Sequence, residues 1–270
     1  MDGGKLMKSI TNKISIKVFK ANKKRNIIAI IAIILTTVLF TSLFTVVQEI
    51  RGAIRQQNIR MIGTDGHVAL KNIDDYIYNT IKGDKRIKQI SYGVVVADAV
   101  VNSELSSSAI EMWYMDPEGL ELYNCKPQVG NYPQDTNEIM MDTGTLKKLN
   151  VPIELGTVIE LKYLVKGNEV SKQFILSGFY DPDPLLNVGR IFVSKSYYEE
   201  NRNQLLNTYY EDGSIAGTVH SYIFFNNALF LEDKLTDLLN DYGFCWADNG
   251  TEDDDRYVNV SSAGQYIKRA

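Results

Sequence analysis

Cysteine and histidine are scarce in this 270-residue chain, with two of each. So few cysteines exclude a disulfide scaffold and a zinc ribbon. Six prolines and 19 glycines are too few for a linker-rich protein, and 44% hydrophobic with 23% charged residues exclude a disordered, collagen-like or low-complexity chain. Neither charge sign dominates, because 29 basic and 33 acidic residues give a net charge of −4. We therefore expect no nucleic acid partner.

The familiar catalytic motifs are missing too. His67 and His220 form no His-x-x-x-His or His-x-His pair, so a zinc site would need other ligands. The sequence contains no Gly-x-Ser-x-Gly elbow, no Ser-x-x-Lys with its companion motifs and no glycine-rich phosphate loop. A cysteine–histidine nucleophile from Cys125 or Cys245 stays open, although a random chain of this composition offers as much. We expect no catalytic, cofactor-binding or metal-ligating residues, and hence no enzyme.

Three further patterns each have a functional and a simpler interpretation. The acidic run 252–255 would gather calcium, but it lacks the alternating ligands and central glycine of an EF-hand loop, so a solvated charge run is favoured. Asp181 and Asp183 stand beside prolines and are more typical of turn residues than of general acids. Core or cross-strand packing explains the paired aromatic residues better than a ligand does; the pairs are Trp113-Tyr114, Tyr197-Tyr198 and Tyr209-Tyr210.

One intensely apolar run, 27–47, contains no charge, proline or glycine in 21 residues. At about 1.5 Å per residue, a helix of this length spans about 30 Å, the thickness of a bilayer core. Its threonine and serine hydroxyls can bond back to the preceding turn. A soluble helix this long normally keeps a polar stripe. A signal peptide has a shorter apolar region and a small-x-small cleavage site, which 48–51 does not provide. The run therefore predicts an uncleaved transmembrane helix.

The charge distribution predicts the orientation of this helix. Residues 1–26 hold eight of the basic residues and one of the acidic residues, a net charge of +7, which leaves −11 for the rest of the chain. Because positive flanks stay in the cytoplasm, we expect 1–26 to be a basic cytoplasmic segment and 48–270 to be extracytoplasmic. As given, the chain is a single-pass protein of the cell membrane. Cys125 and Cys245 then both lie outside, where they form a disulfide or remain half-buried thiols.

The segment just before the membrane has an imperfectly amphipathic pattern. On a helix its apolar residues share one stripe and its lysines a neighbouring one, while Ile16 and Phe19 lie off the apolar stripe; the first set is Ile10, Ile14, Val18 and Ala21, and the second Lys13, Lys17, Lys20 and Lys24. One interpretation is a short helix on the inner membrane surface, whose lysines meet anionic lipid or an acidic partner. The other interpretation is that the segment only sets the orientation of the membrane helix and has no further role. Both stay open.

The external part predicts an α+β domain of mixed helices and strands, in two subdomains, one of them strand-rich at about 105–185. Lys166-Gly167-Asn168 turns a hairpin, Asp142 caps a helix, and Ser196 to Glu199 reads as a capping box. We expect helices at 48–61 (a stalk continuing the membrane helix), 73–82, 142–149, after 196 and at 231–239. Strands are expected at 67–70, 89–101, 110–115, 137–141, 157–165, 172–180, 190–193 and 221–225.

The order of these features resembles the FtsX-like permease family of bacterial ABC transporters, which includes the macrolide-exporter type and the antimicrobial-peptide resistance permeases. KVFKANKKRN leads directly into the first membrane helix. NEIMMDTGTLKKLNVPIELGTVIEL is similar to the family's strand beginning Asn-Glu, its helix with Lys-Lys-Leu and its strand after Gly-Thr. QFILSGFYDPDP resembles the strand ending in Gly-(Ile/Phe)-Tyr, and RIFVSKSYYEEN resembles the Ile-(Tyr/Phe)-Val-Ser strand-to-helix step. The resemblance spans about residues 10–240.

The resemblance implies a non-catalytic permease subunit, or the N-terminal part of one, with a macrolide-exporter-like periplasmic domain that contacts a substrate or partner. It also implies a second permease subunit in the bilayer and a cytoplasmic ABC ATPase, which would bind the ATP. Family members have at least four membrane helices, whereas this sequence shows one, so the expectation is a fragment, a truncated reading frame or a stand-alone derivative. The alternative is a single-pass, membrane-anchored binding or sensor ectodomain.

Overall fold

The computed structural model describes residues 17, 20–62, 66–182, 188–206, 213–227, 229–246 and 257–262, and the chain divides into two compact units, Met1–Gln56 and Gln57–Ala270. Several expectations fall outside the described residues. They are most of the basic segment 1–26, Asp183, the Tyr209-Tyr210 pair and the acidic run 252–255.

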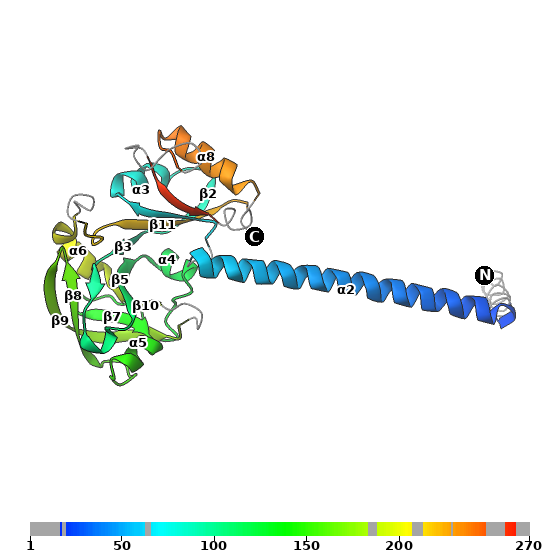
Figure 1. Cartoon of the computed structure of the whole chain (residues 1–270), viewed down its shortest axis with the longest axis horizontal. Helices are drawn as coiled ribbons and strands as arrows, with labels where there is room; N and C mark the ends of the chain where they lie inside the picture. The colour runs from blue at the N-terminus through cyan, green and yellow to red at the C-terminus, as the bar shows by residue number, and fades with distance from the viewer. Residues whose placement is uncertain are drawn as a thin grey trace, which may run out of the picture. The chain divides into compact units, whose positions relative to one another are not determined.

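Helix α2, Lys23–Ile62, accounts for nearly all that is described of the first unit (Figure 1). It contains the predicted membrane segment 27–47 and continues through 48–61, so the predicted helical stalk is confirmed. The hydroxyls of Thr37 and Thr45 donate to the carbonyls of Ile33 and Thr41 at 2.8 and 2.9 Å. These bonds to the preceding turn satisfy the polar groups within the helix itself, as predicted.

The second unit is built on one mixed sheet, in which the described residues form twelve strands in the order β12-β1-β11-β3-β5-β10-β7-β9-β8-β4, with β2 beside β11 and β6 beside β9. The pairs β5–β10 and β7–β9 are parallel, and the others are antiparallel. The strands are β1 Val68–Ile73, β2 Ile87–Ile90, β3 Gly93–Val95, β4 Ala99–Val100, β5 Ala109–Met115, β6 Val129–Gly130, β7 Glu138–Asp142, β8 Val158–Val165, β9 Asn168–Tyr180, β10 Val188–Val193, β11 Val219–Phe225 and β12 Asn259–Ser262.

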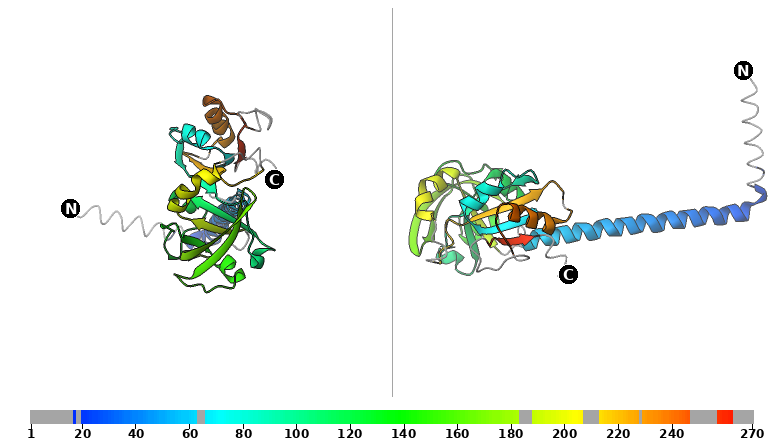
Figure 2. Two further views of the ribbon diagram at one scale, coloured as in Figure 1. Left: turned by 90° about the vertical axis from the view of Figure 1, so that its left-hand side faces the viewer. Right: turned by 90° about the horizontal axis from the view of Figure 1, so that it is seen from above.

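Short helices connect these strands. Helices α3 and α8 lie at one end of the domain, whereas β8 and β9 lie at the other, and Figure 2 shows the same separation in a second view. The mixed α+β class is therefore confirmed, while the division into two subdomains stays a prediction. The helices are α3 Asp75–Ile81, the 3-10 turn η1 Ser103–Leu105, α4 Pro117–Leu122, α5 Thr143–Lys148, α6 Lys195–Leu205 and α8 Leu231–Asp241.

Side-chain caps start most of these helices. The carboxylates of Asp74, Asp116 and Asp142 accept the backbone N–H three residues on, at the starts of α3, α4 and α5. The predicted Asp142 cap is thus confirmed. The predicted capping box at Ser196 is wrong, because Ser194 caps α6 through Tyr197 N at 2.9 Å. Ser196 instead donates to Gln134 O.

The predicted single strand 89–101 is also wrong, since three short strands replace it. Ser91 and Tyr92 lie between β2 and β3, where side chains bind the backbone: Ser91 Oγ accepts from Tyr222 N, and Asp116 Oδ2 accepts from Tyr92 N. Strand β2 pairs with β11, β3 lies between β11 and β5 in the sheet, and β4 pairs with β8. The predicted helix 73–82 begins two residues late, because Ile73 still belongs to β1 and Asp74 is the cap.

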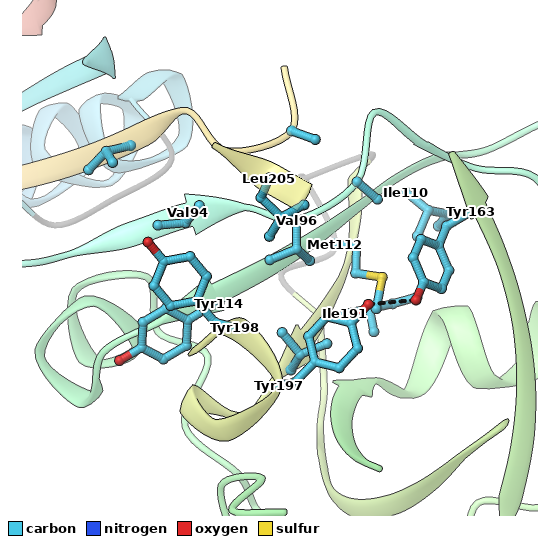
Figure 3. Packing of buried hydrophobic residues seen from close by; sticks show 14 of the residues in the cluster. Val94, Val96, Ile110, Met112, Tyr114, Tyr163, Ile191, Tyr197, Tyr198 and Leu205 are labelled. Carbon is cyan, nitrogen blue, oxygen red and sulfur yellow. Dashed lines mark hydrogen bonds between the residues drawn. The ribbon is translucent and has the colours of Figure 1, made fainter. Parts of the chain in front are cut away.

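Two hydrophobic cores lie on opposite faces of the sheet. Along β5, Met112 and Tyr114 join the larger core, while Trp113 and Met115 join the smaller one, the alternation expected of neighbouring strand residues. The larger core receives residues of α6 and β8 as well, and Figure 3 shows Tyr197 and Tyr163 meeting there through their hydroxyls. The predicted leucine stripe of α8 packs into it too, with Leu235, Leu238 and Leu239 fully buried.

Candidate functional site

Helix α2 presents a long, exposed apolar surface. Lys23–Ala53 is the one described helix long and apolar enough to cross a membrane, and its most apolar stretch is not buried. The helix therefore carries its side chains unprotected from water. Transfer of each large aliphatic or aromatic side chain out of water is worth about 1.5–3 kcal/mol. Several such side chains are about two-thirds exposed; they include Ile28, Leu39 and Phe44.

A cluster of four tyrosines occupies the larger-core face of the sheet, where α3, β5 and α6 meet. We call Tyr78, Tyr92, Tyr114 and Tyr198 the tyrosine cluster. Tyr114 and Tyr198 stack with ring centroids 5.0 Å apart, as Figure 3 shows, and Tyr78 meets Tyr92 edge-on at 4.8 Å. Burial raises the pKa of Tyr114 to about 12, so its hydroxyl stays protonated at any physiological pH. The pair Tyr197-Tyr198 is buried, and the expectation of core packing is confirmed.

Charged residues surround the tyrosine cluster. Asp75 of α3 accepts a hydrogen bond from the Tyr92 hydroxyl at 2.6 Å and forms an ion pair with Arg202 of α6 at 2.6 Å. The Tyr92 hydroxyl also lies 2.9 Å from that of Tyr198. Burial raises the pKa of the Asp116 carboxyl to about 6, although Gly119 N and Tyr92 N both donate to it. Asp116 therefore keeps its proton to a higher pH than a carboxyl exposed to water.

Arg190 forms the second polar cluster, on the smaller-core face. Its side chain is nine-tenths buried, with its guanidinium 4.3 Å from the ring centre of Tyr123 and its Nε 3.8 Å from Glu111. Glu111 in turn accepts from the indole of Trp113 at 3.0 Å. The Cys125 thiol lies beside Arg190 and donates to Tyr123 O. Burial raises the pKa of Cys125, which opposes formation of a nucleophilic thiolate.

The remaining candidate residues are scattered over the domain. His67 accepts from Phe225 N at 3.1 Å and stacks on Phe224, whereas His220 lies edge-on to Trp113 at 4.7 Å. Burial lowers the pKa of His220 to about 3. Cys245 is buried, and its backbone pairs with that of Tyr257 in an isolated parallel β-bridge. It forms no disulfide with Cys125. Over the described ranges, no group of three histidine, cysteine, aspartate or glutamate residues is placed to hold a metal ion.

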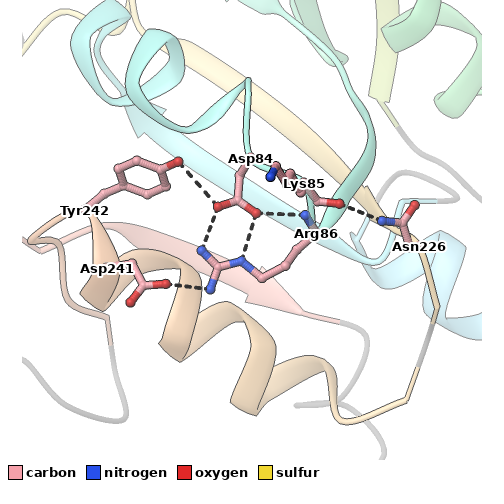
Figure 4. A network of polar contacts seen from close by, with 6 residues as sticks. All are labelled: Asp84, Lys85, Arg86, Asn226, Asp241 and Tyr242. Atoms are coloured by element: carbon pink, nitrogen blue, oxygen red, sulfur yellow. Dashed lines mark hydrogen bonds and ion pairs between the residues drawn. The ribbon is translucent and has the colours of Figure 1, made fainter.

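A third polar network fastens α8 to the segment before β2 (Figure 4). The Asp84 carboxylate accepts from the backbone and guanidinium of Arg86 at 2.6–2.8 Å, and Arg86 pairs with Asp241 at 2.8 Å. The hydrogen bond from Arg86 lowers the pKa of Asp84 to about 2. Asp181, expected in a turn, simply accepts from the hydroxyl of Thr143.

Sequence analysis did not single out Asp75, Tyr92, Asp116, Arg190 or Arg202. Asp116 does have a local partner, since it caps α4 through Gly119 N. The other four lack a local motif, because their partners come from distant parts of the chain; Arg202 and Asp75 are 127 positions apart, and Tyr92 and Tyr198 are 106. The one available signal was the breakdown of strand alternation around Tyr92, which the prediction of a continuous strand overlooked.

No protein-family profile matches the chain, and no curated protein matches it. Among solved structures, the periplasmic region of MacB from Actinobacillus actinomycetemcomitans gives a TM-score of 0.49 at 15% identity, over 78% of this chain and 95% of that one. A domain of a putative permease protein from Porphyromonas gingivalis gives 0.43 at 8% identity, over 73% and 89%. The extracellular domain of the noncanonic ABC-type transporter YknZ from Gram-positive bacteria gives 0.43 at 12% identity, over 72% and 100%.

Proposed function

We propose that the chain is a non-catalytic permease subunit of an ABC transporter, or the N-terminal part of one, working with a separate cytoplasmic ATPase. In this proposal α2 spans the membrane with the basic segment inside. The α+β domain stands outside and contacts a substrate or a partner protein. A second permease subunit pairs with it in the bilayer.

The observation that carries the proposal is how the three resembling segments of the external domain assemble. Residues 137–161 form β7, α5 and the start of β8, residues 173–184 include the end of β9, and residues 190–201 form most of β10 and α6. In the sheet these strands are consecutive neighbours, in the order β10-β7-β9-β8. The pieces of sequence that suggested the family therefore build one continuous part of the fold.

The exposed apolar helix α2 supports the same proposal. An exposed apolar helix is stable only in lipid or against other apolar helices, because in water its outward side chains would aggregate. Cations Lys23, Lys24 and Arg25 precede its uncharged stretch, and Glu49 with Arg51 follow it. In the proposed arrangement this spacing would put charged side chains at both surfaces of a bilayer and none within its core.

Membrane topology is the first test. Val158→Cys introduces an exposed thiol in the external domain, and Lys24→Cys introduces one before the membrane segment. In intact cells a membrane-impermeant maleimide should label the first variant only, and the second only after permeabilisation. The parent chain is the matched control, because Cys125 and Cys245 are buried. Labelling of Lys24→Cys in intact cells, or loss of residues 1–47 by cleavage, would contradict the proposal.

Co-purification with the cytoplasmic ATPase is the second test. If an ABC ATPase is encoded beside it, the full chain is co-expressed in bacterial membranes with that ATPase carrying a tag, solubilised in mild detergent and purified through the tag. The control lacks residues 1–16 but keeps the cations from Lys17 to Arg25 that set the topology. We expect co-purification of the full chain and a clear loss with the control. A correctly inserted chain that never captures the ATPase would favour the single-pass sensor ectodomain.

A further inference from the structure

The sheet of the external domain narrows to a single short strand at β3. Every ladder between the strands β1, β2, β11 and β12 and the rest of the described sheet passes through it. Strand β3 has only three residues; it pairs with β5 at three positions and with β11 at two. We call β1, β2, β11, β12, α3 and α8 the α8 half, and β5, β7, β8, β9, β10, α5 and α6 the α6 half. A sheet joined by so few backbone pairs resists bending poorly at that point.

On the larger-core face, a polar chain crosses this narrow point. Asp75 on α3 binds Arg202 on α6 at 2.6 Å and the Tyr92 hydroxyl at 2.6 Å, and Tyr92 contacts the Tyr198 hydroxyl on α6 at 2.9 Å. We call Asp75, Tyr92, Tyr198 and Arg202 the α3–α6 latch. One carboxylate therefore ties a helix of the α8 half to a helix of the α6 half, both directly and through a tyrosine.

On the smaller-core face, the contacts across the same point are aromatic. Tyr123, at the end of α4, meets Tyr222 of β11 edge-on at 4.6 Å with their hydroxyls in contact, and Trp113 of β5 meets His220 of β11 at 4.7 Å. Tyr123 and Tyr222 are at most 7% exposed. Separating these rings would expose apolar surface to water, which is unfavourable in proportion to the area.

The two faces therefore differ in what opening them requires. The side chains of Arg202 and Asp75 are 49% and 32% exposed, so water replaces their ion pair at little net loss of stability. The aromatic contacts of the smaller-core face have no such replacement, and on the latch face the tyrosine cluster and the larger core also join the two halves. The Asp75–Arg202 ion pair is therefore the contact that water can replace most readily.

We propose that the α3–α6 latch holds the two halves of the external domain in one of two relative orientations, with β3 and the aromatic contacts acting as the hinge. Breaking the latch removes the polar contacts between α3 and α6, while the larger core still joins the two halves. A ligand or partner that binds the two orientations differently would then shift their populations.

Distances between spin labels test the proposal in the full chain, held in lipid nanodiscs. Labels are placed at Leu229→Cys in the segment leading into α8 and at Val158→Cys in β8, two exposed positions, and distances are measured by pulsed electron resonance. The latch is broken by Asp75→Asn, which preserves side-chain size and removes the charge. The matched control is Asp241→Asn, which removes the Arg86–Asp241 ion pair within the α8 half.

We expect one distance population in the labelled parent and a second, shifted population with Asp75→Asn. The control Asp241→Asn should keep the parent distribution. A new population in both variants would indicate general loosening and overturn the proposal. Should Asp75→Asn fail to fold, Tyr198→Phe and Arg202→Gln each remove a single latch contact. A parent-like distribution in all latch variants that fold would overturn the proposal equally.

Discussion

Acidification should destabilise the external domain through His220. Burial lowers the pKa of this imidazole to about 3 from its ordinary value of 6.5, and its buried Nε2 has no hydrogen-bond partner among the described residues. The unfolded chain therefore takes up a proton near pH 6.5, which the folded domain does not. The stability contributed by neutral His220 is present above pH 6.5 and is lost as the pH falls toward 3. Between pH 7 and pH 5 the loss amounts to about 2 kcal/mol by proton linkage.

His220→Phe should remove this loss. A phenyl ring can keep the edge-on contact with Trp113, and it neither titrates nor leaves a buried nitrogen unsatisfied. Urea unfolding of parent and variant at pH 7 and pH 5, followed by circular dichroism, measures the difference directly. We expect the variant to lose about 2 kcal/mol less than the parent on going to pH 5. Because only the difference between the two chains is used, other titrating groups cancel. Equal losses in both chains would refute the reasoning.

Three further predictions follow from other parts of the chain. Asp116 should act in the opposite direction, because its pKa is about 6 in the folded domain and 3.8 in the unfolded chain. The folded domain therefore gains stability as the pH falls from 6 toward 4, by about 1.3 kcal/mol between pH 7 and pH 5. Urea unfolding of Asp116→Asn at the two pH values should lack this gain. Leu235→Ala, in the buried stripe of α8, should lower the free energy of unfolding by about 2–5 kcal/mol in urea melts, whereas Leu229→Ala at an exposed position should change it little. Leu39→Arg should impair membrane insertion, at about 2.5–3.5 kcal/mol for a charge near the bilayer centre, and carbonate extraction should show Ile50→Arg, beyond the apolar run, to be tolerated.

Elements with short-range causes could be predicted from the sequence. The membrane helix follows from an uninterrupted apolar run, the Asp142 cap from an aspartate three residues before the N–H that it accepts, and the hairpin of β8 and β9 from alternation on both sides of Lys166-Gly167. In each case the residues that decide the structure are near neighbours in the chain. Local spacing therefore contained the information.

Elements decided by distant partners could not be predicted. The strand expected at 89–101 is interrupted because Ser91 and Asp116 bind backbone groups of Tyr222 and Tyr92. Ser194 and Ser196 offer equal capping chemistry in sequence, and the choice between them depends on Gln134, whose carbonyl binds Ser196. The polar clusters are of the same kind, since each joins side chains that meet only after the sheet has formed.

The pairing of β1 with β11 and β12 has a consequence for how the domain is made. Strand β1, at Val68–Ile73, is among the first parts of the external domain to be synthesised, yet its described partners lie at Val219–Phe225 and Asn259–Ser262. Folding dominated by such non-local pairs is slow, and unpaired strands are prone to aggregate while they wait. Strand β1 therefore cannot complete its described ladders until residues up to about 262 have been synthesised. Completion of this domain is thus a late event in its synthesis.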